Sequence, residues 1–529
     1  MKKNLLFFAI FFCCQLHAQL TNQWYISPEN TISRMGTPRI DGAKPNDFVT
    51  ASGWINKDNK GLIEFTHIKR SSLIMKHFTW NNLAVDKIVE AKDGSAFIIT
   101  HNAVAKINDS GNIVWCKDYK NSKIDFSQPF TTDAVQNKDT IIIGGVIDET
   151  PKSALQDITL LKINRKSGQF IQQLQLQIPD SIDYLKAMKL TSDGGLIILG
   201  EQSDFHPNLL LIKLDKNSNF VWAKKIVLPL EGLLPYNVIQ TKDGGYAVCG
   251  IYMNQDGFKN ALLLKFDNTG SLLWSKIITQ DLTHITHTSL YESSDSSIIC
   301  CGKINFVQTN TERGLLVKYS KSGELLWAEM SNGYESSAAD PRMISTGTNT
   351  FATICNAKPQ ELLKDVDQLA TGSSNNGLCN YSPIELSTTD ISFSPIDFSL
   401  NITDISSDTK TKNDSITEVA WPHFSQVLCN GSSFNKFPKT TQQSNIFTAS
   451  IAPNVITGNS FTLSINSNKR GNATVIVKQA NGAIAFSNQF FTDAGVSNKT
   501  FTLNDQGKGF YYVQIIINDQ QKQLKFFRN

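Results

Sequence analysis

The chain has 529 residues, of which 40% are hydrophobic and only 18% are charged. Its 50 lysines and arginines against 47 aspartates and glutamates leave a net charge of +3, too little for a nucleic-acid-binding protein of this size. The apolar content excludes a disordered chain, and the low charge excludes a coiled coil. The 31 phenylalanines favour β structure.

The first 18 residues have the features of a secretory signal peptide. Lys2 and Lys3 precede an apolar run that ends at Cys14, and Ala18 is a small residue suited to cleavage. The run is about half as long as the ~20 residues that a membrane helix needs, and no later segment is long and apolar enough for a span. We therefore expect residues 1–18 to be removed from an exported chain. Acylation of Cys13 or Cys14 is the alternative.

Self-similar segments follow at a regular spacing. Five copies align on Lys106, Lys162, Lys213, Lys265 and Lys318, which are 56, 51, 52 and 53 residues apart. Four copies carry a tryptophan after the lysine, at Trp115, Trp222, Trp274 and Trp327. An apolar run upstream of these positions marks seven units, at Ser52, Ile99, Ile143, Leu199, Cys249, Cys301 and Cys355. Such a period is typical of repeat architectures.

Each unit is predicted to form four strands. In the fifth unit these are residues 236–241, 246–252, 261–267 and 271–277, with an Asp-Gly-Gly turn between the first two. The third strand is continuously apolar, as expected for a strand covered on both faces. We predict an all-β fold in which residues 19–430 form a β-propeller of seven four-stranded blades. A linear β-solenoid is the alternative.

The seventh unit departs from the pattern after Cys355. Residues 360–369 are predicted to form a short helix and residues 371–377 a loop, while residues 390–402 supply one or two strands to the seventh blade. Strands near residues 24–26 and 34–40 are predicted to close the ring from the other end. Residues 406–415 are polar and suit a surface loop, and residues 431–445 suit a linker.

The cysteines suit an exported protein with a buried apolar core. Seven of the nine remain after Cys13 and Cys14 are removed, so at least one thiol has no partner within the chain. Cys379 and Cys429 lie 50 residues apart in the irregular stretch and are the candidate disulfide in an oxidising compartment. The adjacent Cys300 and Cys301 are predicted to be core thiols on opposite faces of a strand.

The last part of the chain, residues 446–529, is predicted to form a small β-sandwich. Six short strands recur with turns between them, at residues 461–465, 473–479, 484–491, 499–503, 509–517 and 522–527. Eight further positions form a pattern across this stretch: Pro453, Asn454, Asn481, Gly482, Gly507, Gly509, Tyr511 and Lys525.

This pattern resembles the type A C-terminal sorting domain of the type IX secretion system of Bacteroidota. It departs from that family at Val455, where the second proline of the usual Pro-Asn-Pro is expected. The resemblance implies that the outer-membrane translocon reads the domain, which in many such proteins is then cleaved. The protein is accordingly expected at the cell surface or outside the cell. An ordinary terminal β-sandwich is the alternative.

The repeated tryptophan carries a second resemblance. The spacing of Asp267, Gly270 and Trp274 resembles the tryptophan-docking repeat of quinoprotein dehydrogenases, in which the tryptophan packs between blades and the glycine sets a hairpin. The resemblance implies a structural role for the four tryptophans. It does not imply a quinone, although several quinoprotein enzymes stack a vicinal disulfide, such as Cys300 and Cys301 could form, against their cofactor.

The sequence assigns no catalytic, cofactor-binding or metal-binding residue. His284 and His287 have a spacing that could chelate a metal on a helix, but on a strand they face opposite sides. We expect a non-catalytic binding protein with a surface glycan or protein as ligand, or an accessory component of the secretion or gliding machinery. The alternative is a propeller enzyme that acts on carbohydrate, or less plausibly a quinoprotein oxidoreductase. Carboxylates clustered at the propeller axis would favour the enzyme.

Overall fold

The computed structural model divides the chain into two compact units, Met1–Phe437 and Pro438–Asn529. It describes residues 22–430 except 29–30, 45–46, 57–60, 70–71, 81–84, 101–102, 122–132, 149–155, 179–181, 204–206, 229–230, 281–282, 310, 332–340, 348, 358–365, 375–377, 379–380 and 420–422, and residues 447–528 except 453–454, 457–458, 468–469, 480–483, 504–508 and 518–519. The predicted signal peptide and linker lie outside the described residues.

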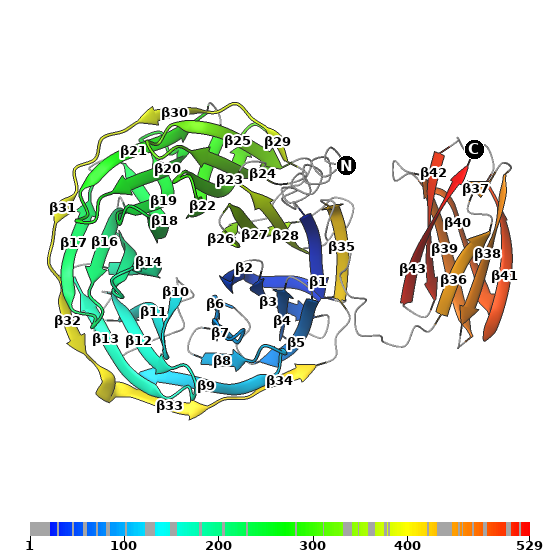
Figure 1. The fold of residues 1–529 in the computed structure, drawn as a ribbon, viewed down its shortest axis with the longest axis horizontal. Coiled ribbons are helices and arrows are strands. Elements are labelled where there is room, and N and C mark those ends of the chain that lie inside the picture. Colours follow the sequence, from blue (N-terminus) through cyan, green and yellow to red (C-terminus); the bar gives the residue numbers. More distant parts are fainter. Residues whose placement is uncertain are drawn as a thin grey trace, which may run out of the picture. The chain divides into compact units, whose positions relative to one another are not determined.

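The described part of the first unit contains seven five-stranded antiparallel sheets arranged in a ring (Figure 1). Most strands of a sheet follow one another along the chain. The consecutive strands are β2 (Thr31–Lys44), β3 (Asp47–Asn56), β4 (Gly61–Lys69) and β5 (Ser72–Trp80) in the first sheet; β6 (Lys87–Glu90), β7 (Ala96–Thr100), β8 (Ala103–Ile107) and β9 (Ile113–Asn121) in the second; β10 (Asp133–Asn137), β11 (Thr140–Asp148), β12 (Gln156–Asn164) and β13 (Phe170–Gln177) in the third; β14 (Ile182–Leu190), β15 (Leu196–Ser203), β16 (Asn208–Leu214) and β17 (Phe220–Ile226) in the fourth; β18 (Gly232–Gln240), β19 (Tyr246–Met253), β20 (Lys259–Phe266) and β21 (Leu272–Thr279) in the fifth; β22 (Thr283–Glu292), β23 (Ile298–Phe306), β24 (Thr311–Tyr319) and β25 (Leu325–Ser331) in the sixth; and β26 (Arg342–Ser345), β27 (Thr350–Ala357) and β28 (Val366–Ser373) in the seventh.

The innermost strands close the ring. Each of β2, β6, β10, β14, β18, β22 and β26 contacts the next, and β26 contacts β2. The strand β1 (Asn22–Pro28) pairs with β28, so the seventh sheet combines strands from both ends of the unit. This confirms that residues 24–26 close the ring. Residues 34–40 belong to β2, the inner strand of the first sheet, which contacts β26 but does not pair with the seventh sheet.

The middle strands of the sheets are buried on both faces. All seven residues of β16 are buried, and their side chains alternate between two apolar clusters. Leu210 and Ile212 pack in the cluster shared with the third sheet, whereas Leu209 and Leu211 pack in the cluster shared with the fifth. Two-sided burial explains why these strands are continuously apolar. The all-β propeller fold predicted from that pattern is confirmed.

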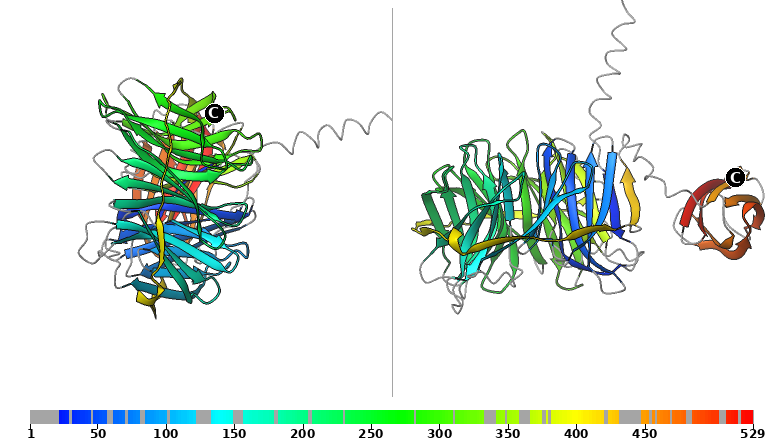
Figure 2. Two further views of the ribbon diagram at one scale, coloured as in Figure 1. Left: turned by 90° about the vertical axis from the view of Figure 1, so that its left-hand side faces the viewer. Right: turned by 90° about the horizontal axis from the view of Figure 1, so that it is seen from below.

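A single segment, residues 381–430, adds a fifth strand to the outer edge of every sheet, and we call it the belt. It pairs with the sixth sheet first, continues in reverse order to the first sheet, and ends on the seventh beside β1. Seen from the side, the belt runs round the outside of the sheets (Figure 2). Its elements are β29 (Tyr381–Pro383), β30 (Ser387–Asp390), β31 (Ile396–Asp397), β32 (Asn401–Asp404), the 3-10 turn η1 (Ser406–Asp408), β33 (Thr409–Asn413), β34 (Ile416–Val419) and β35 (His423–Asn430).

The first half of the belt repeats every seven residues. Pro383, Asp390, Asp397 and Asp404 take equivalent places on four successive sheets, opposite Glu329, Lys276, Lys224 and Leu174. Between these positions, three apolar side chains enter the seams between neighbouring sheets: Leu386, Phe393 and Leu400. The belt therefore satisfies backbone groups at the outer edges and also contributes to the core between sheets.

The belt corrects three predictions. The blades have five strands instead of four, because one outer strand comes from a segment distant in sequence. Residues 390–402 do not complete the seventh sheet but contribute to β30, β31 and β32 on three other sheets. Residues 406–415 form η1, all of β33 and a two-residue connection, so they are not simply a loop.

The predicted helix at residues 360–369 is also wrong where the structure describes it. Val366 begins β28, which continues through much of the predicted loop to Ser373, while residues 358–365 lie outside the described residues. β28 pairs with both β27 and β1, and this pairing takes precedence over the local sequence preference. No helix in the described part of the chain is long and apolar enough to cross a membrane.

The second unit consists of two small sheets around one apolar core. Alternate residues of β38, Phe461, Leu463 and Ile465, pack against Val475 and Val513 of the other sheet. This alternation is the period-two pattern of a half-buried strand. One sheet contains β36 (Phe447–Ala452), β38 (Ser460–Ser467) and β41 (Gly495–Thr502), and the other β37 (Val455–Ile456), β43 (Gln520–Arg528), β42 (Gly509–Ile517), β39 (Gly471–Gln479) and β40 (Ile484–Thr492).

Candidate functional site

The repeated tryptophans lie in the seams between sheets. Trp115, Trp222 and Trp274 each cover a turn glycine of the next sheet, where a Cβ atom would lie 2.8 to 2.9 Å from the indole ring; these glycines are Gly168, Gly270 and Gly323. The three glycines have positive φ angles between 66° and 85°, which side chains rarely adopt. Trp327 packs in the cluster shared by the sixth and seventh sheets. These tryptophans therefore contribute to packing between sheets.

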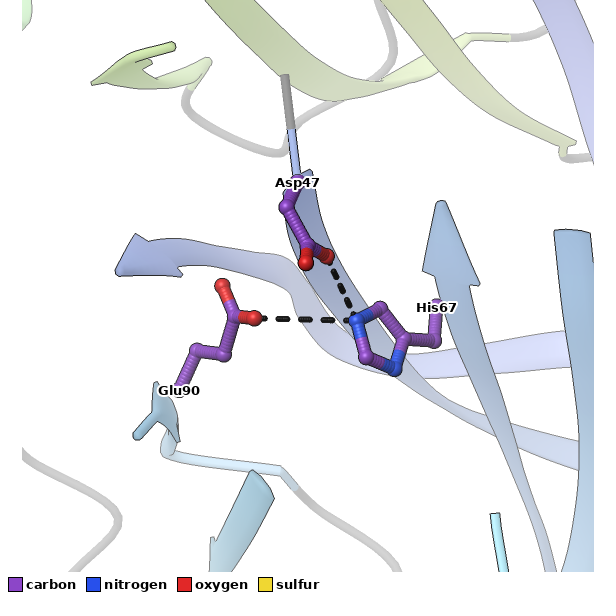
Figure 3. A group of neighbouring side chains, drawn as sticks. All are labelled: Asp47, His67 and Glu90. Carbon is purple, nitrogen blue, oxygen red and sulfur yellow. Dashed lines mark hydrogen bonds and ion pairs between the residues drawn. The ribbon is translucent and has the colours of Figure 1, made fainter. Parts of the chain in front are cut away.

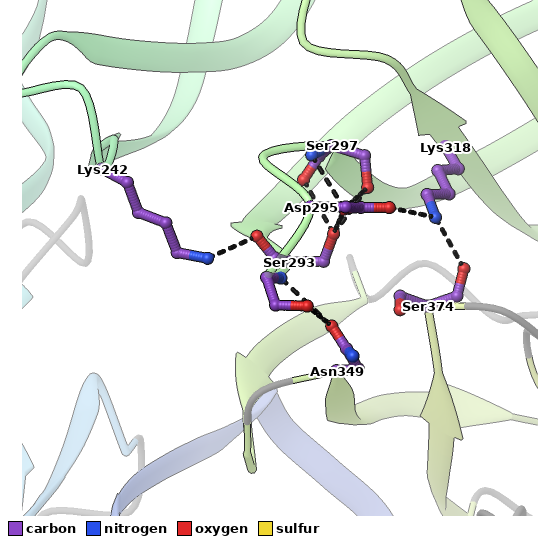
Figure 4. Close-up of polar contacts among 8 residues, drawn as sticks. Lys242, Ser293, Asp295, Ser297, Lys318, Asn349 and Ser374 are labelled. Carbon is purple, nitrogen blue, oxygen red and sulfur yellow. Dashed lines mark hydrogen bonds and ion pairs between the residues drawn. The ribbon is translucent and has the colours of Figure 1, made fainter.

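Three of the aligned lysines anchor the turns between first and second strands. Lys318 Nζ donates to Asp295 Oδ2 and to the Ser374 carbonyl, each at 3.1 Å (Figure 4). Lys213 and Lys265 pair in the same way, at 3.0 Å, with Asp193 and Asp243. Burial raises the pKa of these two aspartates, but hydrogen bonds from the turn and from the lysine lower it to about 2. These lysines therefore have a structural role.

The histidines and adjacent cysteines also have structural environments. Cys300 packs between the fifth and sixth sheets and Cys301 between the sixth and seventh, so their side chains lie on opposite faces of β23. The Cys301 thiol donates to the Pro341 carbonyl at 3.7 Å. His287 is fully buried and within 2.8 Å of the Tyr319 hydroxyl, while His284 Nδ1 accepts from the Lys259 N–H. His284 and His287 thus do not form a chelate.

The candidate disulfide and most of the sorting-domain residues remain predictions. Cys379 lies outside the described residues, and of Cys429 only the backbone, in β35, is described. Tyr511 is buried in the core of the second unit. Gly509 begins β42 and Lys525 lies on β43, opposite Tyr512. Outside the described residues are Pro453, Asn454, Asn481, Gly482 and Gly507.

Charged side chains gather on the innermost strands of five neighbouring sheets. We define the inner charge cluster as Asp41, Lys87, Asp133, Lys189 and Arg342, from β2, β6, β10, β14 and β26. Lys87 Nζ lies 2.8 Å from Asp133 Oδ1. Asp41 Oδ2 accepts a hydrogen bond of 2.8 Å from a backbone N–H of β6. Three cations and two carboxylates leave one excess positive charge.

The excess charge belongs to Lys189 and Arg342, since Lys87 is paired. Burial and the charges of Lys87 and Arg342 lower the pKa of Lys189, while Asp133 and Asp41 oppose this effect. Within the described residues, the Arg342 Nε–H is buried without a hydrogen-bond acceptor. An anionic group placed between these cations would relieve their repulsion and accept that hydrogen bond.

Neutral polar side chains connect the inner strands β18, β22 and β26. Asn237 on β18 donates through Nδ2 to Ser289 Oγ on β22 at 3.0 Å, and the Ser289 hydroxyl donates to the Met343 carbonyl on β26 at 3.1 Å. These two hydrogen bonds link three successive inner strands through the side chains of Asn237 and Ser289. These neutral contacts of β18 and β22 differ from the ionic contacts of the inner charge cluster.

A second group of titratable side chains lies between the first and second sheets (Figure 3). His67 Nε2 lies 2.6 Å from Asp47 Oδ1 and 3.6 Å from Glu90 Oε1. The side chains of His67 and Glu90 are fully buried, and that of Asp47 is 16% exposed. These residues come from β4, β3 and β6, so two sheets must pack together before the group forms.

Neither group is predicted from the sequence. Their members lie outside the aligned lysine, glycine and tryptophan positions, and they come together only through packing between units. The available signal was the charged residues on the first strands of successive units, such as Asp41, Lys87 and Asp133, because a charge on an inner strand needs a partner from another unit.

Comparison with known proteins assigns no family to this chain. No protein-family model and no curated protein matches the chain. A solved structure of the WD40 domain of SCAP from fission yeast matches with 11% identity and a TM-score of 0.27, covering 66% of this chain and 98% of that one. The extracellular domain of a putative hybrid two-component system from B. thetaiotaomicron matches with 9% identity and a TM-score of 0.19, covering 93% and 92%.

Proposed function

We propose that this protein is an exported, non-catalytic binding protein whose propeller takes an acidic group of its ligand at the inner charge cluster. The ligand is a surface glycan or an envelope component that carries a carboxylate, phosphate or sulfate. The observation that carries the proposal is the excess positive charge of Lys189 and Arg342 on the innermost strands.

The chemistry of Asp133 favours binding over hydrolysis. A glycosidase needs one carboxylic acid with a raised pKa to protonate the leaving group. Burial raises the pKa of Asp133, but the charges of Lys87 and Lys189 and hydrogen bonds from Lys87 and the Met188 N–H lower it to about 2. Asp133 therefore stays ionised at neutral pH and suits the positioning of cations instead of proton donation.

Titration of the purified full chain with paired oligosaccharides tests this function. Oligogalacturonate and its neutral methyl ester share one backbone and differ in charge, so calorimetry on both separates recognition of charge from recognition of sugar. Phosphorylated and sulfated oligosaccharides extend the panel. We expect at least one acidic ligand to bind ten or more times more tightly than its neutral counterpart. Equal binding throughout, or release of reducing ends, would reject the proposal.

The second unit supports a proposed export route through the type IX secretion system. Its small sandwich and the eight residues that resemble the sorting domain agree with that role, as does the predicted signal peptide. Deletion of residues 438–529 should leave the propeller folded but retain it in the periplasm. Pull-down of the tagged full chain from its native envelope then distinguishes a protein that is only secreted by this system from an accessory component of the system. Stable recovery of translocon subunits would reject the first of these roles.

A further inference from the structure

The group of Asp47, His67 and Glu90 brings three potential metal ligands to one point. One ligand atom from each residue lies within 4.8 Å of the other two. The imidazole and the two carboxylates point toward one another from three strands of two sheets (Figure 3). An imidazole nitrogen with two carboxylate oxygens is a donor set found around divalent transition-metal ions.

The distances fit an ion after a small movement. Ligands about 2.0 Å from a tetrahedral ion lie about 3.3 Å apart. The observed separation of 3.6 Å between His67 Nε2 and Glu90 Oε1 is close to this value, and the 2.6 Å between His67 Nε2 and Asp47 Oδ1 is shorter. Asp47 begins β3 and is the exposed member, so it can move outward by less than an ångström to admit the ion.

Charge balance also favours a cation. Two carboxylates with a neutral imidazole carry a charge of −2, and a protonated imidazole reduces this only to −1. A divalent cation is the ion whose charge matches this donor set. A divalent ion bound by His67, Asp47 and Glu90 would balance the charge of these three side chains.

We propose that Asp47, His67 and Glu90 form a binding site for a divalent transition-metal ion that joins the first and second sheets of the propeller. The site shares no side chain with the inner charge cluster and does not depend on the proposed ligand, although the Glu90 N–H donates to Asp41 Oδ2 of that cluster at 2.8 Å. The alternative is a group without metal in which a protonated His67 lies between the two carboxylates. Added metal should bind and stabilise the protein only if the three side chains form the metal site.

Calorimetric titration of the full chain, prepared without a histidine tag and treated with a chelator, tests the site. Zinc and manganese are the probes. We expect one equivalent of at least one ion to bind, with the affinity reduced ten-fold or more in Asp47→Asn and lost in His67→Gln. Cobalt added to the metal-free chain should give the visible absorption of a four- or five-coordinate ion, and this absorption should be absent in His67→Gln.

His77 provides the matched control. It lies in the same sheet, on β5, and its Nε2 is 3.3 Å from Glu64 Oε2, so it is also a buried histidine beside a carboxylate. His77→Gln should leave metal binding unchanged. If His67→Gln fails to fold, Asp47→Asn decides, because the same added metal should raise the thermal midpoint of this variant less than that of the wild type. No bound equivalent, or equal binding in wild type and both site variants, would overturn the proposal.

Discussion

Replacement of Phe393 by alanine tests whether the belt holds the propeller together. Phe393 lies between β30 and β31, is 9% exposed, and packs in the apolar cluster shared by the fourth and fifth sheets. Its ring centroid is 6.4 Å from that of Tyr252. We expect Phe393→Ala to destabilise the first unit while leaving its fold unchanged.

The magnitude follows from the apolar area that the ring covers. Loss of the ring removes about 120 Å² of buried apolar surface, or about 3 kcal/mol at about 25 cal/mol per Å². Ile396 lies three residues further along the same belt but is 55% exposed. Ile396→Ala is the matched control and should cost less than about 0.5 kcal/mol.

Guanidinium titration followed by tryptophan fluorescence measures this difference. All eight tryptophans precede residue 438, so the signal reports the first unit alone. The midpoint of Phe393→Ala should fall clearly below those of wild type and Ile396→Ala. Coinciding midpoints for the two variants would mean that the belt adds no stability beyond that of the ring, and would refute the reasoning.

Other variants test the repeated turns and the buried histidine. Gly244 and Gly270 both have positive φ, so replacement by alanine should cost about 1–2 kcal/mol of stability at each position. Only at Gly270 would the new Cβ atom lie 2.8 Å from a tryptophan ring, so the guanidinium midpoint of Gly270→Ala should be the lower of the two. Equal midpoints for the two variants would contradict tryptophan docking. The lowered pKa of Asp193 and Asp243, about 2 in the folded chain, contributes stability that is present above about pH 4 and lost as pH falls through about 2. The double variant Asp193→Asn/Asp243→Asn should therefore lose less stability than the wild type as the pH falls from about 4 to about 2. Thermal midpoints at each pH measure this loss. Burial lowers the pKa of His287 to about 3, so its imidazole NMR signals should not titrate between about pH 5 and 8; a titration there would place it in contact with solvent.

The propeller could be predicted from the sequence because its signals are local and repeated. Asp-Gly turns, continuous apolar strands and the Gly-to-Trp spacing each lie within one unit. In the fifth unit, residues 261–267 were predicted as a buried third strand, and β20 spans Lys259–Phe266 with seven of its eight residues buried. Packing between sheets reinforces what the local pattern already favours.

The belt could not be predicted in the same way because its strands are only two to eight residues long. Their partners lie up to several hundred residues earlier, as in the pairing of Ile416 with Trp80. A signal was nevertheless present, in a seven-residue repeat that reads Asp-Ile-Ser-Phe at 390–393, Asp-Phe-Ser-Leu at 397–400 and Asp-Ile-Ser-Ser at 404–407. This seven-residue period distinguishes the belt from the seventh unit, because the units themselves repeat at a much longer spacing.

The two candidate sites depend on contacts between units that no local pattern encodes. Asp133 and Lys87 meet because β6 and β10 are neighbours in the ring, and His67 meets Glu90 because the first two sheets pack together. Each residue alone resembles an ordinary charged position on a strand. Their chemistry appears only once the order of the sheets is known.

The most direct test of the proposed function compares three variants for binding of the acidic oligosaccharide that wild type prefers. Lys189→Met and Arg342→Met each remove one cation of the inner charge cluster and should weaken binding about ten-fold or more, as expected for a hydrogen bond to a charged group worth about 1.5–3 kcal/mol. Lys186→Met is the control, because Lys186 also lies on β14 but forms an ion pair of 2.8 Å with Glu201. We expect its affinity to equal that of wild type. Unchanged affinity in Lys189→Met and Arg342→Met would contradict binding at the inner charge cluster.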